Sequence, residues 1–200
     1  MSAAPSLPFE TGTALLPRKR FTREEVQVMM DLGWFAGQRY ELIDGDLIDK
    51  MGQNPPHSFA IKLLQEWLAS IFGVRRCQIQ SPIEVSVADQ ERSLPEPDIA
   101  VLTEWKVEYA KRHPRGDELV LALEVADNSA SVDLNRKATM YAAAGVPEYW
   151  VLDLIRRRLV VHRQPGSLGY KLVQFLAETD TISLENCSER IRVSDLLPTA

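Results

Sequence analysis

The sequence has little cysteine, no long apolar run and no excess of positive charge. Its two cysteines, Cys77 and Cys187, are far apart and form no CxxC pair, so neither a disulfide framework nor a cysteine-based zinc site is expected. The longest mostly apolar run, 119–126, falls well short of the roughly 20 residues that a membrane-spanning helix needs. The N-terminus also lacks the cationic and apolar regions of a secretory signal. We therefore expect a soluble cytoplasmic protein.

The composition is that of one ordinary globular domain. The chain has 200 residues, of which 45% are hydrophobic and 26% are charged, which is enough to bury a sizeable core. Its 23 basic and 28 acidic residues give a formal charge of −5, which argues against a protein that coats nucleic acid non-specifically. Residues 1–20 are proline-rich and show no apolar periodicity, so we predict a mobile N-terminal arm followed by a single domain over 21–200.

Helix and strand signals are mixed along the domain without a strict βαβ repeat. Amphipathic periodicity predicts helices over 22–32, 57–72 and 133–144. Asp44-Gly45 predicts a tight turn between two strands, 40–43 and 47–51. Further strands are expected over 77–80, 83–87, 99–102, 119–126, 149–154, 158–163 and 170–176, with a short strand and a helical turn over 191–197. This mixture predicts an α/β (α+β) fold with a mixed β-sheet flanked by helices.

Glu124 interrupts the otherwise apolar strand 119–126. Side chains alternate along a strand, which divides this one into two faces. Glu124 shares its face with small residues, and the other face is expected to hold Leu119, Leu121, Leu123 and Val125. A charge among apolar neighbours is costly unless it is paired or binds a metal. The alternative is that this end of the strand is solvated and that Glu124 pairs with an arginine.

Two further acidic residues stand at strand positions. Asp98 follows two prolines and begins strand 99–102 on the face of Ala100. Pro-Asp is also common in plain turns, which is the alternative interpretation of Asp98. Glu41 lies in strand 40–43 and shares a face with Ile43. For an isolated glutamate beside a hairpin, exposure to solvent is the usual outcome.

Lys137 favours an inward-facing arrangement of these acidic residues. In helix 133–144 it lies on the stripe expected to face the sheet, with Leu134, Met140, Tyr141 and Ala144. Because this helix follows strand 119–126, the ammonium of Lys137 can meet Glu124 at the C-terminal end of the strand. The alternative is an exposed pair with Asp133, four residues earlier, which contributes only about 0.3–0.5 kcal/mol.

Pro97-Asp98, a strand and then Glu124 resemble the signature of the PD-(D/E)xK nuclease superfamily. Over 21–197 the chain is similar to a large bacterial family of proteins assigned as restriction endonucleases, the Uma-type family. The motifs that carry this resemblance are Tyr40-Glu-Leu-Ile-Asp-Gly-Asp-Leu47, Pro56-His57, Pro97-Asp98, Glu124-Val125, Lys137 and Gly145-Val-Pro-Glu-Tyr-Trp-Val-Leu-Asp153. The superfamily lysine, expected two residues after Glu124, is replaced by Ala126.

The resemblance implies a restriction-endonuclease-like fold and a DNA endonuclease that hydrolyses phosphodiester bonds with Mg²⁺ or Mn²⁺. It implies that Lys137 supplies the missing amine and acts on the attacking water. The implied metal ligands are Asp98, Glu124, the Val125 carbonyl and, directly or through water, Glu41. Hard divalent cations prefer such oxygen ligands, whereas the scattered histidines offer no zinc pair. His57 is expected near the site, at the start of a helix, rather than as a ligand.

Double-stranded DNA is the expected partner, and three basic clusters are candidate contacts: 75–76, 111–115 and 156–158. A homodimer is expected because two-fold dimers are the commonest soluble assembly. Two alternatives stay open, namely a non-catalytic module on the same fold that binds nucleic acid or protein, and hydrolysis of a different phosphodiester. The acidic residues and the inward lysine favour the enzyme, because a scaffold would gain stability from apolar residues in their place.

Overall fold

The structure is a computed structural model that describes residues 18–50, 54–127 and 131–199. Its α-helices are α1 (Arg23–Asp31), α2 (Pro55–Phe72) and α3 (Ser131–Ala143). Its strands are β1 (Tyr40–Ile43), β2 (Asp46–Asp49), β3 (Cys77–Ile79), β4 (Ile99–Leu102), β5 (Leu119–Ala126), β6 (Glu148–Asp153), β7 (Arg158–Gly166), β8 (Gly169–Ala177), β9 (Thr181–Ile182) and β10 (Ile191–Arg192). Short 3-10 helices are η1 (Val74–Arg76), η2 (Val107–Ala110), η3 (Gly116–Glu118) and η4 (Val193–Leu196).

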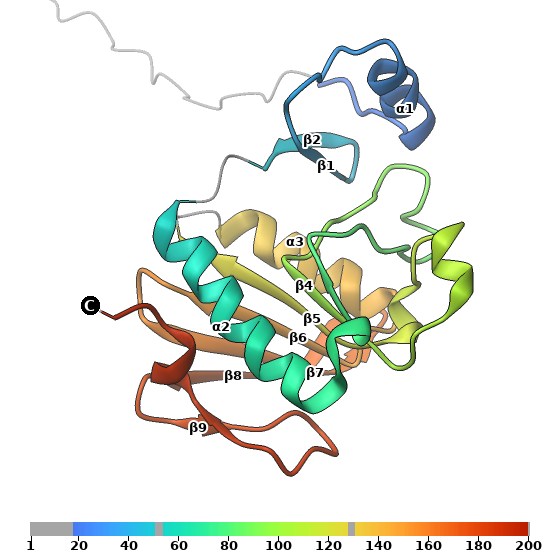
Figure 1. Ribbon diagram of the computed structural model, residues 1–200. Helices are drawn as coiled ribbons and strands as arrows, with labels where there is room; N and C mark the ends of the chain where they lie inside the picture. Colours follow the sequence, from blue (N-terminus) through green and yellow to red (C-terminus); the bar gives the residue numbers. More distant parts are fainter. Residues whose placement is uncertain (1–17, 51–53, 128–130, 200) are drawn as a thin grey trace, which may run out of the picture.

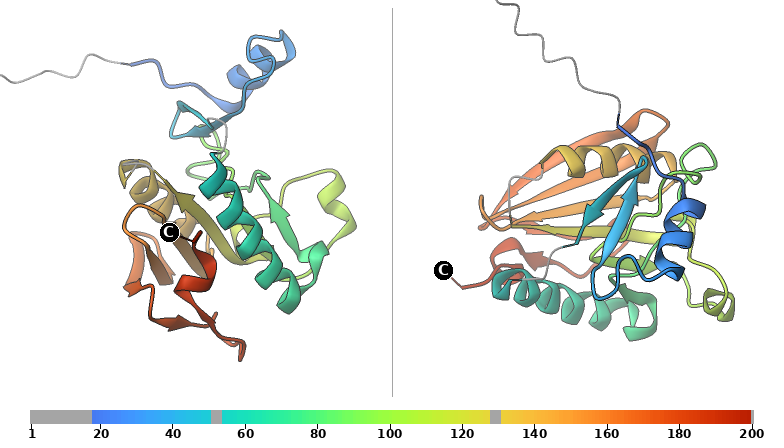
Figure 2. Two further views of the ribbon diagram at one scale, coloured as in Figure 1. Left: turned by 60° about the vertical axis from the view of Figure 1, so that its left-hand side comes forward. Right: turned by 90° about the horizontal axis from the view of Figure 1, so that it is seen from above.

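A six-stranded mixed sheet forms the centre of the molecule, in the order β3-β4-β5-β6-β7-β8 (Figure 1). Neighbouring strands are antiparallel except β5 and β6, which run parallel and are connected through α3. α2 and α3 cover opposite faces of the sheet, whereas α1 and the β1–β2 hairpin stand at one end of it (Figure 2). The predicted α+β fold with a mixed sheet between helices is therefore confirmed.

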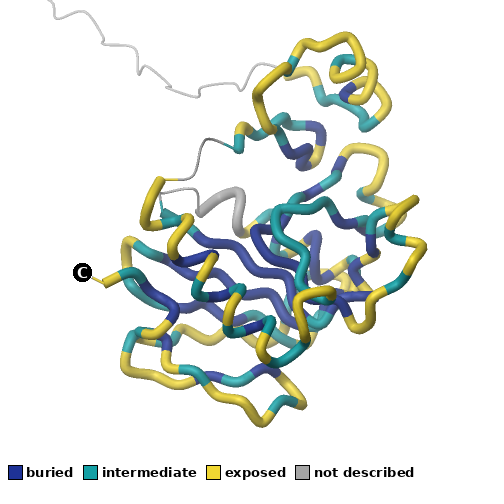
Figure 3. Tube along the Cα trace, viewed as in Figure 1, coloured by how far each residue is buried: buried dark blue, intermediate teal, exposed yellow. Residues whose placement is uncertain are grey.

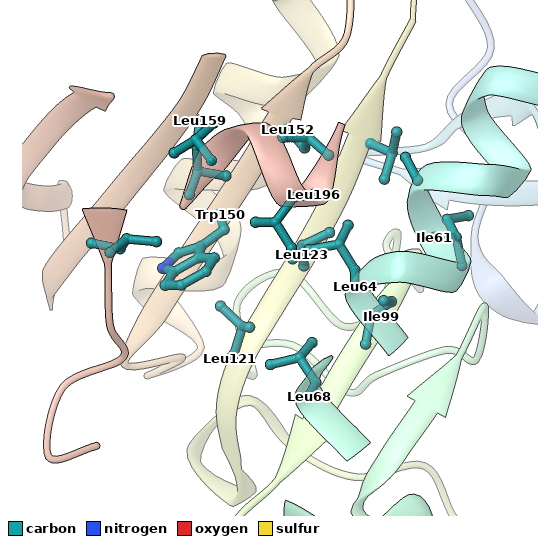
Figure 4. Packing of buried hydrophobic residues seen from close by; sticks show 14 of the residues in the cluster. Ile61, Leu64, Leu68, Ile99, Leu121, Leu123, Trp150, Leu152, Leu159 and Leu196 are labelled. Atoms are coloured by element: carbon teal, nitrogen blue, oxygen red, sulfur yellow. The ribbon is translucent and has the colours of Figure 1, made fainter. Parts of the chain in front are cut away.

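The core lies mainly between α2 and the sheet. Leu64 and Leu68 are fully buried there against Leu121, Leu123 and Trp150 (Figure 4). The central strands are the most buried part of the chain, and the loops at the rim are exposed (Figure 3). Burying a leucine side chain contributes roughly 1.5–3 kcal/mol, so this layer fixes the positions of β4 and β5.

The α3 face of the sheet carries smaller side chains at its centre. Ala100 of β4 and Ala122 of β5 are both buried and leave room for the rings of Tyr141 and Tyr149. These rings meet edge to face, with centroids 5.1 Å apart, a favourable arrangement for aromatic pairs. α3 thereby packs closely enough to bring its inner side chains to the end of β5.

The predicted β1–β2 hairpin is confirmed. Asp44 and Gly45 both have positive φ, 50° and 77°, as a two-residue turn of this kind requires. A Cβ at Gly45 would lie 2.8 Å from the Cβ of Arg20, so only glycine fits there. The hairpin is docked on the body through a bridge between Leu42 and Leu94 and through Arg136, which donates to the Ile43 carbonyl at 2.9 Å.

The predicted helices are also confirmed, with ends set by local chemistry. Thr22 and Glu25 form the capping box of α1, each side chain accepting the other residue's backbone N–H. The side chain of Asn54 caps α2 by accepting from the His57 N–H at 3.0 Å. α2 ends at Gly73, whose φ of 81° stops a helix.

The strand predicted over 83–87 is wrong. Ile83 and Val85 are buried as the alternation indicates, but the segment forms only one isolated bridge, from Glu84 to Arg115. The N–H groups of Ile83 and Glu84 donate to the carbonyls of Pro95 and Pro114. Because those prolines have no N–H to return, a regular ladder does not form.

The predicted face of Leu119 is also wrong. Between Val101 and Leu102 the β4–β5 register shifts, so β5 contains one extra residue, Val120, beside this step. Such a bulge reverses the alternation beyond it. Leu119 consequently joins the cluster on the α3 face, with Ala122, while Val120 packs against the opposite cluster.

Most of the predicted N-terminal arm, 1–20, lies outside the described residues. The division into this arm and one domain over 21–200 therefore stays a prediction. Among the described residues, no helix is both long and apolar enough to cross a membrane.

Candidate active site

The end of the β4–β5 pair brings two predicted site residues together. Ile99 of β4 lies opposite Leu123 of β5, so Asp98, directly before β4, comes beside the end of β5 that carries Glu124, and it accepts from the Val125 N–H. Residues directly opposite in an antiparallel pair lie on the same face with Cβ atoms about 4.5–5.5 Å apart. Both side chains are buried, with 2% of Asp98 and 5% of Glu124 exposed. Their location on one face agrees with the sequence prediction.

Lys137 of α3 points inward and contacts Glu124, as predicted. Its Nζ lies 2.8 Å from Oε1 of Glu124 and 2.8 Å from Oε1 of Glu41, and the lysine is 4% exposed. The Tyr141 hydroxyl, one helical turn further on, donates to the same Oε1 of Glu124 at 3.2 Å. The ammonium is therefore a buried cation shared by two carboxylates rather than half of a surface pair.

Glu41 connects the hairpin to this cluster. It is 5% exposed, so the exposed alternative considered from the sequence is wrong. One carboxylate oxygen meets Lys137, and the other accepts from the backbone N–H of Glu96 at 3.1 Å. A charged group buried with two donors is stable there, because its lost hydration is replaced on both oxygens. Docking of the hairpin thus completes the pairing of Lys137.

Asp98 is held as an anion by donors on several sides. Its Oδ2 accepts from the Val125 N–H at 2.9 Å and lies 3.5 Å from Nε2 of His57. Its Oδ1 accepts from the Gln80 amide at 3.3 Å and lies 3.8 Å from Nζ of Lys50. Burial alone would raise the pKa of Asp98, but these donors and charges outweigh it and lower the pKa to about 2.

His57 lies beside the site, at the start of α2, as the sequence predicts. The Asn54 cap also donates to Asp127 at 2.7 Å, which fixes the first turn of α2 next to the end of β5. The imidazole then lies between Asp98 and Asp127, with Nδ1 3.8 Å from the latter. Burial lowers the pKa of His57, but the two aspartates more than compensate and raise it above its usual value.

The pKa of Glu124 shifts in the opposite direction from that of Asp98. Burial is the main cause and raises the pKa of Glu124 to about 7, although the Lys137 ammonium offsets part of the effect. The pKa of Lys137 itself is raised, because the nearby charges of Glu124 and Glu41 outweigh its own desolvation. One ammonium facing two buried carboxylates therefore stays protonated, and Glu124 binds a proton more readily than Asp98 does.

Lys50, which sequence reasoning missed, also enters the site. It follows β2, and its Nζ donates to the Glu96 carbonyl at 2.6 Å. A sequence signal for it exists, since Glu41 pairs with Ile48 and Lys50 stands two residues beyond Ile48, on the same face of the hairpin. Gln80 and Glu96 were missed as well, because they reach the site from irregular segments.

The oxygen atoms at this site are of the types that bind a hard divalent cation, but they do not converge on one point. In the ranges 18–50, 54–127 and 131–199, no three His, Cys, Asp or Glu side chains converge as they would around a bound ion. The acceptors at the site are carboxylate and backbone oxygens, the ligands that Mg²⁺ and Mn²⁺ prefer. An ammonium, that of Lys50, already lies among them, so the chemistry of the site accommodates positive charge. Coordination by Asp98, Glu124, Val125 and Glu41 stays a prediction.

The three basic clusters differ in how their charges are used. In 111–115, Arg112 pairs with Glu118 and Arg115 with Asp117. In 156–158, each arginine has an acidic partner, Asp153 or Glu178. In 75–76, the guanidinium groups lie over the rings of Trp105 and Phe72.

The sheet, its two covering helices and this cluster of acidic residues around an internal lysine define a restriction-endonuclease-like protein. The chain belongs to the Uma2 family, described as "Putative restriction endonuclease", whose pattern matches residues 30–195. The resemblance drawn from the sequence is thereby confirmed.

One solved structure shows the same fold. It is described as a putative nuclease belonging to DUF820 from Anabaena variabilis ATCC 29413. The two chains share 14% identity, with a TM-score of 0.65 over 88% of this chain and 97% of the other. No curated protein matches the sequence.

Proposed function

We propose that this protein is a metal-dependent DNA endonuclease that hydrolyses phosphodiester bonds with Mg²⁺ or Mn²⁺. The observation that carries the proposal is the buried Lys137, which lies between Glu41 and Glu124 beside Asp98. Buried charges of this kind contribute less to stability than apolar residues of the same size would. Their presence at one end of the central strands therefore favours a chemical role.

The side chains divide into two roles. Asp98 and Glu124, with the Val125 carbonyl and with Glu41 directly or through water, would hold the cation. When bound, a divalent cation there would supply charge stabilisation for the phosphoryl group and an activated water. Asp98 is suited to this role, because its depressed pKa keeps it ionised at every physiological pH.

Lys137 acts as a fixed donor rather than as a base. Because its pKa is raised, the ammonium remains charged and has no free electron pair with which to remove a proton. Glu41 holds it from the hairpin side and Glu124 from β5, so the ammonium is fixed in place and has one N–H group left for a further acceptor. A positive donor held in place in this way stabilises negative charge that develops on a phosphate oxygen and orients a water beside it.

Double-stranded DNA is the proposed substrate, and a cytoplasmic location is proposed with it. Of the three basic clusters, 75–76 is the one for which no ion pair with an acidic side chain is found among the described residues, whereas the arginines of the other two pair with carboxylates. The positive charge of Arg75 and Arg76 is therefore left for phosphates. They follow α2, which has 18 residues and is about 27 Å long, whereas His57 marks its other end at the site. A duplex lying along α2 would contact both ends.

A homodimer through β8 is the proposed assembly. β8 is the last strand of the sheet, and no described strand pairs with its outer edge. It exposes an apolar surface, with Phe175 63% and Val173 43% exposed, and Lys171 is its one charged residue. Two copies paired antiparallel about Val173 would place Lys171 opposite Phe175 and avoid a like-charge contact.

The proposed dimer is tested by Val173→Lys. This substitution sets two lysines together at the two-fold axis, so light scattering should report a monomer. A dimer in that variant, or a monomeric wild type, would contradict this assembly.

The experiment that tests the proposed activity is nicking of supercoiled plasmid with and without added Mg²⁺ or Mn²⁺. We expect wild-type nicking to require the ion, and Asp98→Asn and Glu124→Gln to reduce it to background while the circular dichroism spectrum is unchanged, because each loses an anionic ligand. Asp117→Asn, which removes a carboxylate from the exposed ion pair with Arg115 outside the site, is the matched control. Equal nicking by wild type and Asp98→Asn would contradict the proposal. Metal binding without cleavage of DNA, RNA or small phosphodiesters would favour the non-catalytic binding module.

A further inference from the structure

The ammonium of Lys50 occupies the kind of position that a bound cation takes. Its Nζ donates to the Glu96 carbonyl at 2.6 Å and lies 3.8 Å from Asp98 and 4.0 Å from the Glu96 carboxylate. Only 13% of the Lys50 side chain is exposed. These neighbours are one backbone carbonyl and two carboxylates, which are ligand types of a hard divalent cation.

The other charges around the site are already paired, which leaves Lys50 to Asp98. Lys137 serves Glu41 and Glu124, and Arg39 forms an ion pair with Glu96. Asp98 meets Lys50 and His57 instead. Lys50 is also close enough to Glu124 to oppose the rise of its pKa. One ammonium thus interacts with Asp98 and Glu124, two of the three carboxylates that the proposed function assigns to the metal.

We propose that Lys50 is a built-in counter-cation that must leave Asp98 before a divalent ion can bind there, so that it lowers the affinity of the site for the metal. The inference rests on the proposed metal-dependent function. Two like charges close together in a low-dielectric site repel strongly, so the ammonium and the ion exclude one another. The backbone of Lys50 stays fixed, because its N–H donates to the Arg39 carbonyl at 2.9 Å. Departure of Nζ then requires rotation of the side chain alone.

The position of Lys50 also explains why no three ligands converge in the described residues. With an ammonium beside Asp98, the carboxylates need not approach one another to be neutralised. Removal of the ammonium leaves Asp98 with His57 as its remaining ionic partner and makes a divalent ion the better counter-charge.

The test is Mn²⁺ binding to the metal-free full-length protein, measured by electron paramagnetic resonance without DNA. Lys50→Gln keeps a donor for the Glu96 carbonyl and removes the charge, so we expect it to bind Mn²⁺ about tenfold more tightly than wild type. Lys50→Arg keeps the charge and should bind like wild type. Lys106→Gln removes one positive charge from the unrelated cluster with Glu104 and Glu118, so it controls for net charge. Lys50→Met replaces the glutamine variant if that one does not fold.

The outcomes separate this inference from the proposed function. Equal or weaker Mn²⁺ binding by Lys50→Gln, with wild type binding the ion, overturns the role of Lys50 and leaves the metal site standing. The same gain in Lys106→Gln also overturns it, because net charge would then be the cause. Absence of Mn²⁺ binding by both wild type and Lys50→Gln overturns the inference and the proposed metal dependence together.

Discussion

Two buried glutamates stand at the two ends of one strand, and their pKa values shift in opposite directions. Glu118 comes directly before β5, and Glu124 lies near its C-terminal end. Their exposed fractions are similar, 6% and 5%. The pKa of Glu118 is lowered, whereas that of Glu124 is raised to about 7. Burial alone therefore does not determine the direction in which the pKa of a carboxylate shifts.

The difference lies in the donors that each carboxylate receives. Glu118 accepts two hydrogen bonds from Arg112, at 2.6 and 2.8 Å, one from Lys106 and one from the Arg115 N–H. The Arg112 hydrogen bond is the main cause of its lowered pKa. Glu124 shares a single ammonium with Glu41 and lies beside Asp98. The carboxylate of Glu118 therefore has a donor for each of its oxygens. The Glu124 end of β5 instead has an excess of negative charge, which a cation would neutralise.

The largest loss of stability is expected from removing Lys137, the cation that Glu41 and Glu124 share. Lys137→Met leaves Glu41 and Glu124 buried without their ammonium, and breaking a buried pair in this way costs about 3–5 kcal/mol. Urea unfolding should report that loss. Lys62→Met, at an exposed position of α2, is the control and should change the free energy of unfolding by less than about 0.5 kcal/mol. A loss below about 1 kcal/mol for Lys137→Met would show that the cluster rehydrates freely.

A smaller effect is expected at the satisfied end. Glu118→Gln keeps the shape but loses the charged acceptor of Arg112, and hydrogen bonds to charged groups contribute about 1.5–3 kcal/mol. We expect a loss of about 2 kcal/mol in urea unfolding at pH 7. Glu124→Gln should cost less, because its raised pKa shows that the neutral form is tolerated. The reverse order of the two variants would contradict the comparison.

The smallest effect concerns pH. The folded-state pKa of Glu118 is lowered, so its contribution to stability is present above its unfolded pKa and is lost as the pH falls below about 4.5. As the pH falls below about 4.5, the free energy of unfolding of wild type should therefore decline more steeply than that of Glu118→Gln. Urea midpoints measured across this range check the expectation. Parallel declines would show that Glu118 is not the group responsible.

Much of the fold and part of the site follow from local sequence patterns. Lys137 and Glu124 could be brought together because helical spacing and strand alternation each define a face, and the two elements are adjacent in the chain. The Asp44-Gly45 turn is equally local. Asp98 and Glu41 were assigned roles through the family resemblance, since neither has a local signal that separates it from an exposed acid.

The remainder depends on contacts that no local pattern encodes. Lys50 reaches Asp98 only because the hairpin docks on the sheet. Gln80 reaches Asp98 from an irregular segment, where its own backbone has a positive φ. The alternation of 83–87 correctly predicts buried side chains. The segment does not form a strand, because it lies against Pro95 and Pro114, which have no N–H to donate. The bulge at Val120 arises from pairing with β4 and is invisible in β5 alone.

The proposed function makes the Glu124 end of β5 catalytic and gives the Glu118 end a structural role only. The most direct test is metal-dependent nicking of supercoiled plasmid by wild type, Glu118→Gln and Glu124→Gln, each shown to be folded at the assay temperature. We expect wild type and Glu118→Gln to cut when Mg²⁺ or Mn²⁺ is added and Glu124→Gln not to cut. Equal cutting by the two variants would contradict this expectation.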